Sequence, residues 1–351
     1  MAADELGPWR GARLRETAER FNGDGADDDL PEPHRFARGV GRLIVRRQQR
    51  NGASMRRDAV SLFLLMPEGV PGASAKREPT LGDGDVEVAG RIWFVGCNAQ
   101  TGRYLEPAST EPGDLFDEVE AMGCGTAPAV LFNPRISPPS LHFYPNGVRE
   151  DAISQSIEIG GAPVTVERVE AILDRMWEMC FISPDAQIEH GSGVWKDAAK
   201  HWTAEQAEAI VQSHMKTALA VALVDCVIRH EQPTPLGRVD LEIEQSTGTG
   251  WTRPVEMEVK VLRERGSTGR PKGDLFNNRW IRRGARQAAA YRDARQALAG
   301  MLCCFDMRVV DRDLSYCTDE TAAYAAGLDV RVFRRFLYNS AEAARLARYG
   351  P

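Results

Sequence analysis

Residues 236–262 read LGRVDLEIEQSTGTGWTRPVEMEVKVL, and this stretch decides the fold of the chain around it. Apolar and charged residues alternate in two runs, 239–244 and 255–261. Alternation with a period of two is typical of strands that have one buried face. The Gly- and Thr-rich residues 245–253 between the runs predict a hairpin loop. We therefore expect two neighbouring strands that carry acidic side chains on their second face.

The charged face of these strands holds residues that suit hydrolytic chemistry. Asp240 lies on the first strand, and Glu258 and Lys260 lie two residues apart on the second, so that they point the same way. Carboxylates are ligands that Mg²⁺ or Mn²⁺ prefers, and an ammonium beside the metal positions a water molecule and favours its deprotonation. The strands thus predict a metal site made by Asp240, Glu258 and the carbonyl of Val259, with Lys260 beside it.

Glu208 interrupts the apolar side of a helix that we expect at about 203–223. The helix buries a stripe that includes Met215 and Ala222, and Glu208 falls on the same stripe because it lies seven residues before Met215. A carboxylate in this position is costly without a partner. The partner is either a structural salt bridge or a neighbouring metal site, and Glu205 is the alternative candidate one turn earlier.

A second helix, expected at about 280–299, follows the two strands. It places Gln287 and Tyr291 one turn apart on one face, where both can approach the strands. Spacing alone is equally compatible with Tyr291 as an ordinary core residue.

The order of these motifs resembles that of the PD-(D/E)XK nuclease superfamily, whose fold is restriction-endonuclease-like. The resemblance covers roughly residues 200–310 and consists of GRVD at 237–240, EVK at 258–260 and QAAAY at 287–291, after a helix that carries a Glu. Val239 replaces the Pro of the name-giving motif. The resemblance implies a mixed sheet flanked by helices, metal-dependent hydrolysis of phosphodiester bonds and a place for Glu208 at the metal. It favours DNA over RNA, in a restriction or antiphage-defence setting.

Basic residues cluster immediately after the Glu258–Lys260 strand. Residues 260–295 contain eleven Lys or Arg against three acidic residues, whereas the whole chain has a net charge of −6. A basic stretch beside a metal site suits a polyanionic substrate, and a solvated helix face is the lesser alternative. Residues 265–279 predict a long polar loop. The expected nucleic-acid contacts are Lys272, Arg282, Arg283, Arg286 and Tyr291, and Gln287 would help to hold the phosphate backbone.

The sequence predicts two domains, with α/β architecture in the second and α+β overall. The first, residues 1–190, would be a recognition or regulatory domain, and the second, residues 195–351, the nuclease-like domain. The Gly-rich residues 190–193 predict the junction, and Thr203 and Gln206 predict a capping box that starts the first helix after it. In the first domain we expect helices at 12–21, 34–48 and 163–180, and strands at 59–66, 91–97, 129–132 and 141–144.

Composition indicates a reducing compartment. The seven cysteines lack Cys-x-x-Cys spacing, the N-terminus lacks the features of a signal peptide, and no apolar run approaches ~20 residues. We expect a cytoplasmic protein without a membrane partner.

The function that these observations favour is a Mg²⁺- or Mn²⁺-dependent nuclease that acts on nucleic acid, as a homodimer or with a partner protein of a defence system. The first alternative is a nuclease-like fold that binds nucleic acid or a partner without cutting. The second is an α/β interaction protein in which the acids are surface residues.

Overall fold

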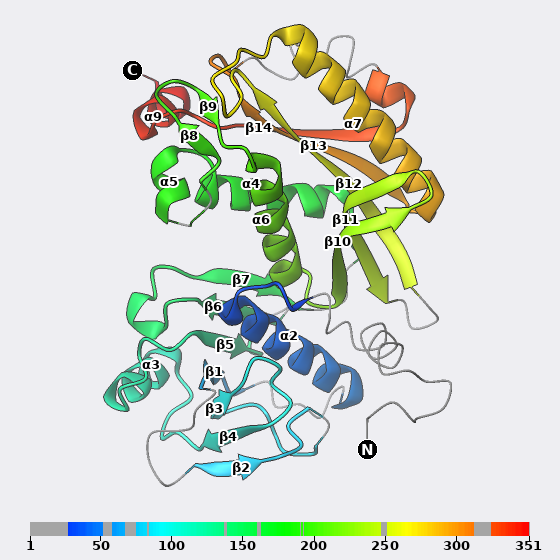
Figure 1. Cartoon of the computed structure of the whole chain (residues 1–351). Coiled ribbons are helices and arrows are strands. Elements are labelled where there is room, and N and C mark those ends of the chain that lie inside the picture. Colours follow the sequence, from blue (N-terminus) through cyan, green and yellow to red (C-terminus); the bar gives the residue numbers. More distant parts are fainter. Residues whose placement is uncertain are drawn as a thin grey trace, which may run out of the picture. The chain divides into compact units, whose positions relative to one another are not determined.

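The computed structural model describes most of the chain, in two compact units. The N-terminal unit is Met1–Ala162 with Ala220–Asp225, and the C-terminal unit is Pro163–Leu219 with Cys226–Pro351. Both are mixed α/β structures (Figure 1). The described residues are 27–51, 58–66, 75–82, 84–136, 139–159, 163–189, 191, 193–246, 251–311 and 324–350.

The N-terminal unit contains a seven-stranded sheet in the order β2-β4-β3-β1-β5-β6-β7. Strands β1 and β3 are parallel, and the other described pairs are antiparallel. The strands are β1 (Ser61–Leu65), β2 (Lys76–Glu78), β3 (Ile92–Val95), β4 (Gly102–Leu105), β5 (Ala129–Asn133), β6 (Ser140–Tyr144) and β7 (Gln155–Glu158).

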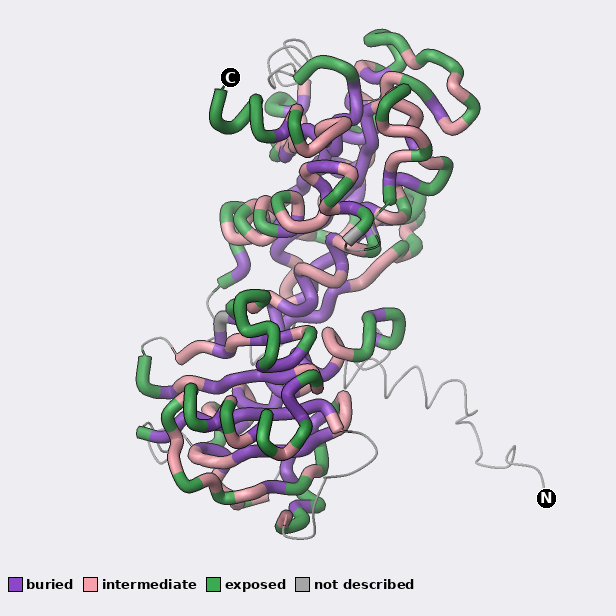
Figure 2. The backbone as a smooth tube through the Cα atoms, turned by 90° about the vertical axis from the view of Figure 1, so that its left-hand side faces the viewer, coloured by how far each residue is buried: buried purple, intermediate pink, exposed green. Residues whose placement is uncertain are grey.

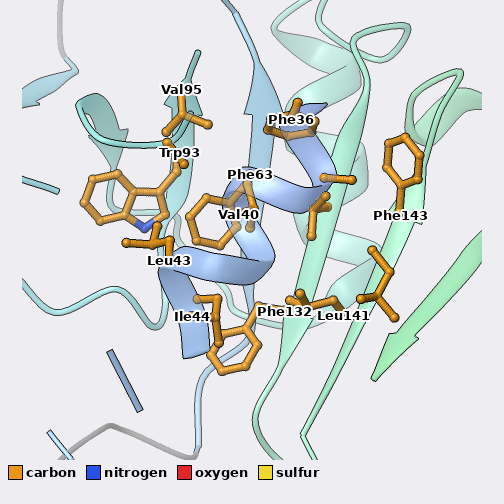
Figure 3. Close-up of a cluster of buried hydrophobic side chains, with 14 of the residues drawn as sticks. Phe36, Val40, Leu43, Ile44, Phe63, Trp93, Val95, Phe132, Leu141 and Phe143 are labelled. Carbon is orange, nitrogen blue, oxygen red and sulfur yellow. The ribbon is translucent and has the colours of Figure 1, made fainter. Parts of the chain in front are cut away.

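Helices cover both faces of this sheet. Helix α2 (Glu32–Asn51) packs on the face that includes Phe63 and Trp93 (Figure 3), and α3 (Pro112–Ala121) packs on the face that includes Leu62. Successive residues of a strand point to opposite faces. Burial on both sides therefore explains why β1 reads as an unbroken apolar run, SLFLL.

Arg38 on α2 holds the segment Ala220–Asp225 to the N-terminal unit. Its guanidinium donates to the carbonyls of Ala220 and Leu223, the latter at 3.0 Å, and to Asp27 Oδ2 at 2.9 Å. The Arg38 side chain is 1% exposed, so these bonds replace all of its hydration.

The C-terminal unit contains a five-stranded sheet in the order β10-β11-β12-β13-β14. Neighbours from β10 to β12 are antiparallel, and neighbours from β12 to β14 are parallel. The strands are β10 (Cys226–Thr234), β11 (Gly237–Ser246), β12 (Trp251–Arg263), β13 (Ala299–Met307) and β14 (Val330–Phe336), with a separate hairpin of β8 (Trp195–Asp197) and β9 (Trp202–Thr203). The helices are α4 (Val166–Cys180), α5 (Pro184–Glu189), α6 (Ala207–Ala222), α7 (Asp274–Arg295) and α9 (Ala341–Tyr349).

Helix α7 packs on the face of the sheet that includes Leu262, Leu302 and Cys304. On the same helix, Ile281 and Ala285 are buried against these strands. Figure 2 shows buried residues along the strands of both sheets and exposed residues mainly on helices and connections. None of the described helices is long and apolar enough to span a membrane.

The division of the chain differs from the expected boundary at 190–195. Helix α4 belongs to the C-terminal unit because it packs on β14: Trp177 Nε1 donates to Phe336 O at 2.8 Å, and Arg331 forms a bidentate pair with Glu170. Helix α4 ends at Cys180, and Pro184 starts the separate helix α5. Proline is favoured in the first turn of a helix.

Two further expectations in this region were wrong. The capping box fails because Thr203 lies in β9 and the helix begins at Ala207. The long loop expected at 265–279 is shorter, because α7 begins at Asp274. The helix expected at 12–21 lies outside the described residues, and strands β2, β4 and β7 and helix α3 were missed.

The buried Arg38 network generates a stability prediction. Replacing Arg38 by Ala leaves two carbonyls without their buried donor and Asp27 ion-paired only with Arg42 among the described residues, so the free energy of unfolding should fall by about 3 kcal/mol, the lower end of the range for broken buried pairs. Arg42→Ala is the matched control, because Arg42 pairs with the same carboxylate at 2.7 Å but its side chain is 24% exposed. Its cost should be about 1 kcal/mol. Urea unfolding measures both, and equal losses would contradict the assignment.

Candidate functional site

The site lies in the C-terminal unit, where strands β11 and β12 stop pairing. Their ladder extends from Ser246 and Trp251 to Leu241 and Met257 and ends there. Beyond this point the N–H of Val259 donates to Asp240 Oδ2 at 2.8 Å. The carboxylate of Asp240 therefore takes the place of a strand partner, since a buried main-chain amide needs an acceptor.

Glu208 on α6 is positioned by the N–H of Val261, the next amide of β12 that faces the same edge as the N–H of Val259. The N–H of Val261 lies 3.4 Å from Glu208 Oε2. The polar residue on the apolar stripe of α6 is therefore directed to the same strand edge as Asp240. Glu205, the alternative, is exposed.

Lys260 connects the carboxylates of the site. Its ammonium donates to Glu258 Oε1 and, at 3.0 Å, to Val259 O, and it lies 3.8 Å from Glu208 Oε1. The side chains of Lys260 and Glu258 are only 5% and 2% exposed. Because buried charges need partners, this pair and the two carboxylates beside it form one interdependent group.

Helix α7 closes the site from the other side through Gly284 and Trp280. A Cβ at Gly284 would lie 3.1 Å from Lys260 Cγ and 2.7 Å from Leu302 Cδ1, so only glycine permits this approach. One turn earlier, the Trp280 ring lies 5.2 Å from Lys260 Nζ. The lysine stem is thus fixed between β12 and α7.

Burial and like charge perturb the acids of the site. Burial raises the pKa of Glu258 to about 7, with the neighbouring Asp240 charge adding to the rise. Burial also raises the pKa of Asp240, against the opposing hydrogen bond from Val259. For Lys260 burial lowers the pKa, but Glu258 and Glu208 outweigh it, and the net shift is upward. The ammonium therefore stays charged at neutral pH.

A second carboxylate pair lies next to the site. Glu242 and Glu256 are directly opposite each other on β11 and β12, and both are buried. Burial and the Glu242 charge raise the pKa of Glu256 to about 10. Arg295 lies 3.2 Å and Arg253 3.6 Å from Glu242 Oε2. Glu256 is therefore neutral at pH 7, and the arginines balance the charge of its partner.

Gln212 is a residue of the site that the sequence analysis missed. It lies one turn after Glu208 on α6, is buried, and its side chain hydrogen-bonds to Asp240. Its Oε1 is also 3.3 Å from His230 Nε2. The available signal was a second polar residue four positions after Glu208, on the inward side of the same helix.

The predicted site residues separate into two groups. Asp240, Glu258, Lys260 and Glu208 come together as expected. Gln287 lies one turn after Gly284 on α7, and its Nε2 donates to the Tyr291 hydroxyl at 3.2 Å. The structure describes no hydrogen bond from Gln287 to the four acidic and basic residues.

The residues expected to contact nucleic acid differ in their exposure. Tyr291 is 3% exposed, so the expectation that it contacts nucleic acid was wrong and the core alternative is correct. Arg283 and Arg286 are exposed on α7, whereas Lys272 and Arg282 are half-buried, with Arg282 near the Tyr324 ring.

The oxygen ligands of the site suit a hard divalent cation, although these side chains do not form a typical metal-binding cluster. Among the described residues, no group of three or more His, Cys, Asp and Glu side chains is arranged to hold a metal ion. Glu258 Oε2 is nevertheless buried and has no hydrogen-bond partner in the part of the chain that the structure describes. Two carboxylates, Glu258 and Glu208, also share the Lys260 ammonium. Mg²⁺ typically takes one or two carboxylates and keeps several waters, so Asp240, Glu258 and the Val259 carbonyl would be sufficient.

Comparisons with protein-family models, with curated proteins and with solved structures found no match to this chain.

The raised pKa of Glu258 generates a prediction for the metal-free protein. Between about pH 4.5 and 7 the folded chain holds a proton on Glu258 that the unfolded chain has lost. Stability from this group is therefore fully present below pH 4.5 and is lost as the pH rises through 7, by about 3 kcal/mol. We expect the urea midpoint in EDTA to fall between pH 5 and pH 8.

Glu258→Gln should reduce this fall, because the amide cannot titrate, and the exposed control Glu205→Gln should leave it unchanged. An equal fall in wild type and Glu258→Gln would contradict the assigned pKa.

Proposed function

We propose that this chain is a metal-dependent nuclease that hydrolyses phosphodiester bonds, of DNA rather than RNA, in a restriction or antiphage-defence setting. The observation that carries the proposal is the position of Lys260. Its ammonium contacts Glu258 and lies 3.8 Å from Glu208, while Asp240 occupies the adjoining strand edge.

The arrangement of elements supports this proposal. Helix α6 precedes β10, β11 and β12, and α7 and β13 follow in a sheet with both antiparallel and parallel pairs. Asp240 lies on β11, the Glu-x-Lys motif on β12 and Glu208 on α6. This is the order that the resemblance to the PD-(D/E)XK superfamily implies.

The residues divide the chemistry between them. Bound Mg²⁺ or Mn²⁺ would supply positive charge to the phosphate and lower the pKa of a water molecule. Asp240, Glu258 and the Val259 carbonyl would hold that ion, and the Lys260 ammonium would orient the attacking water. Glu208 keeps the ammonium charged and oriented.

The basic side of α7 would hold the substrate. Arg283 and Arg286 are exposed there: Arg283 lies one turn before Gln287, and Arg286 immediately precedes it. Exposed guanidinium groups bind phosphate oxygens without reading sequence. We assign recognition or regulation to the N-terminal unit, and the assembly would be a homodimer or a complex with a partner protein.

Separate substitutions of Asp240 and Lys260 test the proposed roles. Asp240→Ala removes a metal ligand, so Mg²⁺ or Mn²⁺ affinity and cleavage should fall together. Lys260→Ala removes a positive charge and keeps both carboxylates, so metal should still bind while cleavage falls by at least ~10²-fold. Supercoiled plasmid, single-stranded DNA and RNA are the substrates, each with Mg²⁺, Mn²⁺ or EDTA, and calorimetry measures metal binding.

Lys76→Ala is the matched control, because Lys76 also pairs with a glutamate, at 2.9 Å, but on an exposed surface. It should cleave at the wild-type rate. A folded Lys260→Ala protein that does the same would contradict the nuclease assignment and favour a fold that binds without cutting.

The basic side of α7 can be tested through the salt dependence of binding. Charge reversal at Arg283 and Arg286 should weaken nucleic-acid binding, and each lost phosphate contact should lower the slope of log K against log salt by roughly 1. Arg345→Glu on α9 is the control, since Arg345 is also exposed on a helix. Fluorescence anisotropy between 50 and about 200 mM salt measures the slopes. Identical slopes for all three proteins would mean that the arginines are only solvated.

A further inference from the structure

Two aromatic rings on the first turns of α7 form a platform next to Lys260. Phe276 and Trp280 lie one turn apart, with ring centroids 5.9 Å apart and planes inclined by only 14°. Phe276 is 37% exposed, and the Trp280 ring lies 5.2 Å from Lys260 Nζ. The two rings therefore form a stack from a partly exposed surface to the proposed catalytic lysine.

A basic side chain lies near each ring of this stack. Lys272 Nζ lies 4.4 Å from the Phe276 ring centroid, and the Arg283 guanidinium lies 5.6 Å from that of Trp280. The Trp280 Nε1 is buried and has no hydrogen-bond partner among the described residues. A buried indole N–H usually has an acceptor, so an acceptor from a bound molecule would complete this group.

A turn at residues 264–272, immediately before α7, contacts Trp202 on β9. The turn is ordered by hydrogen bonds from Gly266 N to Arg270 O, 3.0 Å, and from Lys272 N to Glu264 O, 2.7 Å. Gly269 lies flat on Trp202: its φ is +77°, and a Cβ there would be 2.7 Å from Trp202 Cζ2.

The hairpin that carries Trp202 is also basic. Lys196 and Lys200 lie 5.9 and 5.4 Å from the Trp202 ring, and Lys196 Nζ donates to Ser267 O at 2.8 Å. We call Trp202, Phe276 and Trp280, with Lys196, Lys200, Lys272 and Arg283, the aromatic track. Every contact in it lies within the C-terminal unit.

We infer that the aromatic track binds an unpaired nucleotide strand and directs it to Lys260, so that the substrate of the proposed nuclease is single-stranded or locally unwound; this inference rests on the proposed function. Bases stack on aromatic rings whatever their sequence, and cations between the rings follow the phosphates. In a duplex both faces of a base are covered by neighbouring bases, and only an unpaired base offers a face to Phe276. Alternation of rings and cations suits a strand better than it suits a protein partner.

The test measures binding without cleavage, in EDTA, by anisotropy of labelled 20-nucleotide strands. Phe276→Leu removes the ring and keeps an apolar side chain, so affinity for single strands should fall about 10-fold, whereas affinity for duplex of the same length should change less than about twofold. Phe276→Trp should retain single-strand affinity. Tyr349→Leu on α9, a ring that is 78% exposed, is the control and should change neither affinity.

Two further comparisons complete the test. DNA and RNA strands of equal length show which sugar the track prefers, and both should depend on Phe276. An unchanged single-strand affinity in Phe276→Leu, or an equal loss on duplex, would overturn the inference.

Cleavage assays with Mg²⁺ separate the two proposals. Cleavage by the wild type together with Phe276-independent binding would overturn the track and leave the nuclease. Phe276-dependent binding without any cleavage would support the track as a binding surface and contradict the nuclease.

Discussion

The end of the ladder between β11 and β12 is the constraint on which the site depends. Past Leu241 and Met257, strand β12 keeps its hydrogen bonds to β13 on one edge, while its other edge offers the amides of Val259 and Val261 without a strand partner. Such amides require acceptors, because leaving them unpaired in a buried position costs about 1–3 kcal/mol each. Carboxylates from two different elements supply the acceptors, and main-chain geometry thereby positions both.

The second constraint on the site is the balance of its buried charges. Glu258 and Lys260 are buried side by side, and removing two charges from water is compensated only when their geometry and further hydrogen bonds are good. The Val259 carbonyl accepts a hydrogen bond from the ammonium, and Glu208 adds a second negative charge 3.8 Å away. Gly284 lets α7 approach closely enough to exclude water from the lysine stem. Farther along the same strands the buried charge is balanced differently: arginines pair with Glu242, and Glu256 is neutral.

The parts that could be predicted from the sequence are those set by local periodicity. Alternation placed Asp240, Glu258 and Lys260 on two adjacent strands, and helical spacing singled out Glu208. The position of α6's first turn was not predictable, because Thr203 pairs with Trp195 in a hairpin that has no local signal. Neither was the burial of Tyr291, whose hydroxyl fits against Gly237, a contact between residues far apart in the chain.

The same limit explains the boundary between the two units. The Gly-rich residues 190–193 have the composition of a linker, but composition does not report which sheet a preceding helix packs against. The bonds of α4 to β14 join residues about 160 positions apart, and such long-range contacts leave no pattern in a short window. Gln212 was missed for a similar reason: its two partners lie on β10 and β11.

The position of the Lys260 ammonium also determines how the site is neutralised without a metal ion. It donates to Glu258 Oε1 and to Val259 O, which are also oxygens that a bound cation would use. The lysine is therefore an internal counter-ion that balances part of the buried carboxylate charge. Structural zinc domains differ, because many of them remain unfolded until metal arrives. In this chain the charge of Glu258 has a buried partner from the protein itself, so the arrangement of these side chains does not require a bound ion.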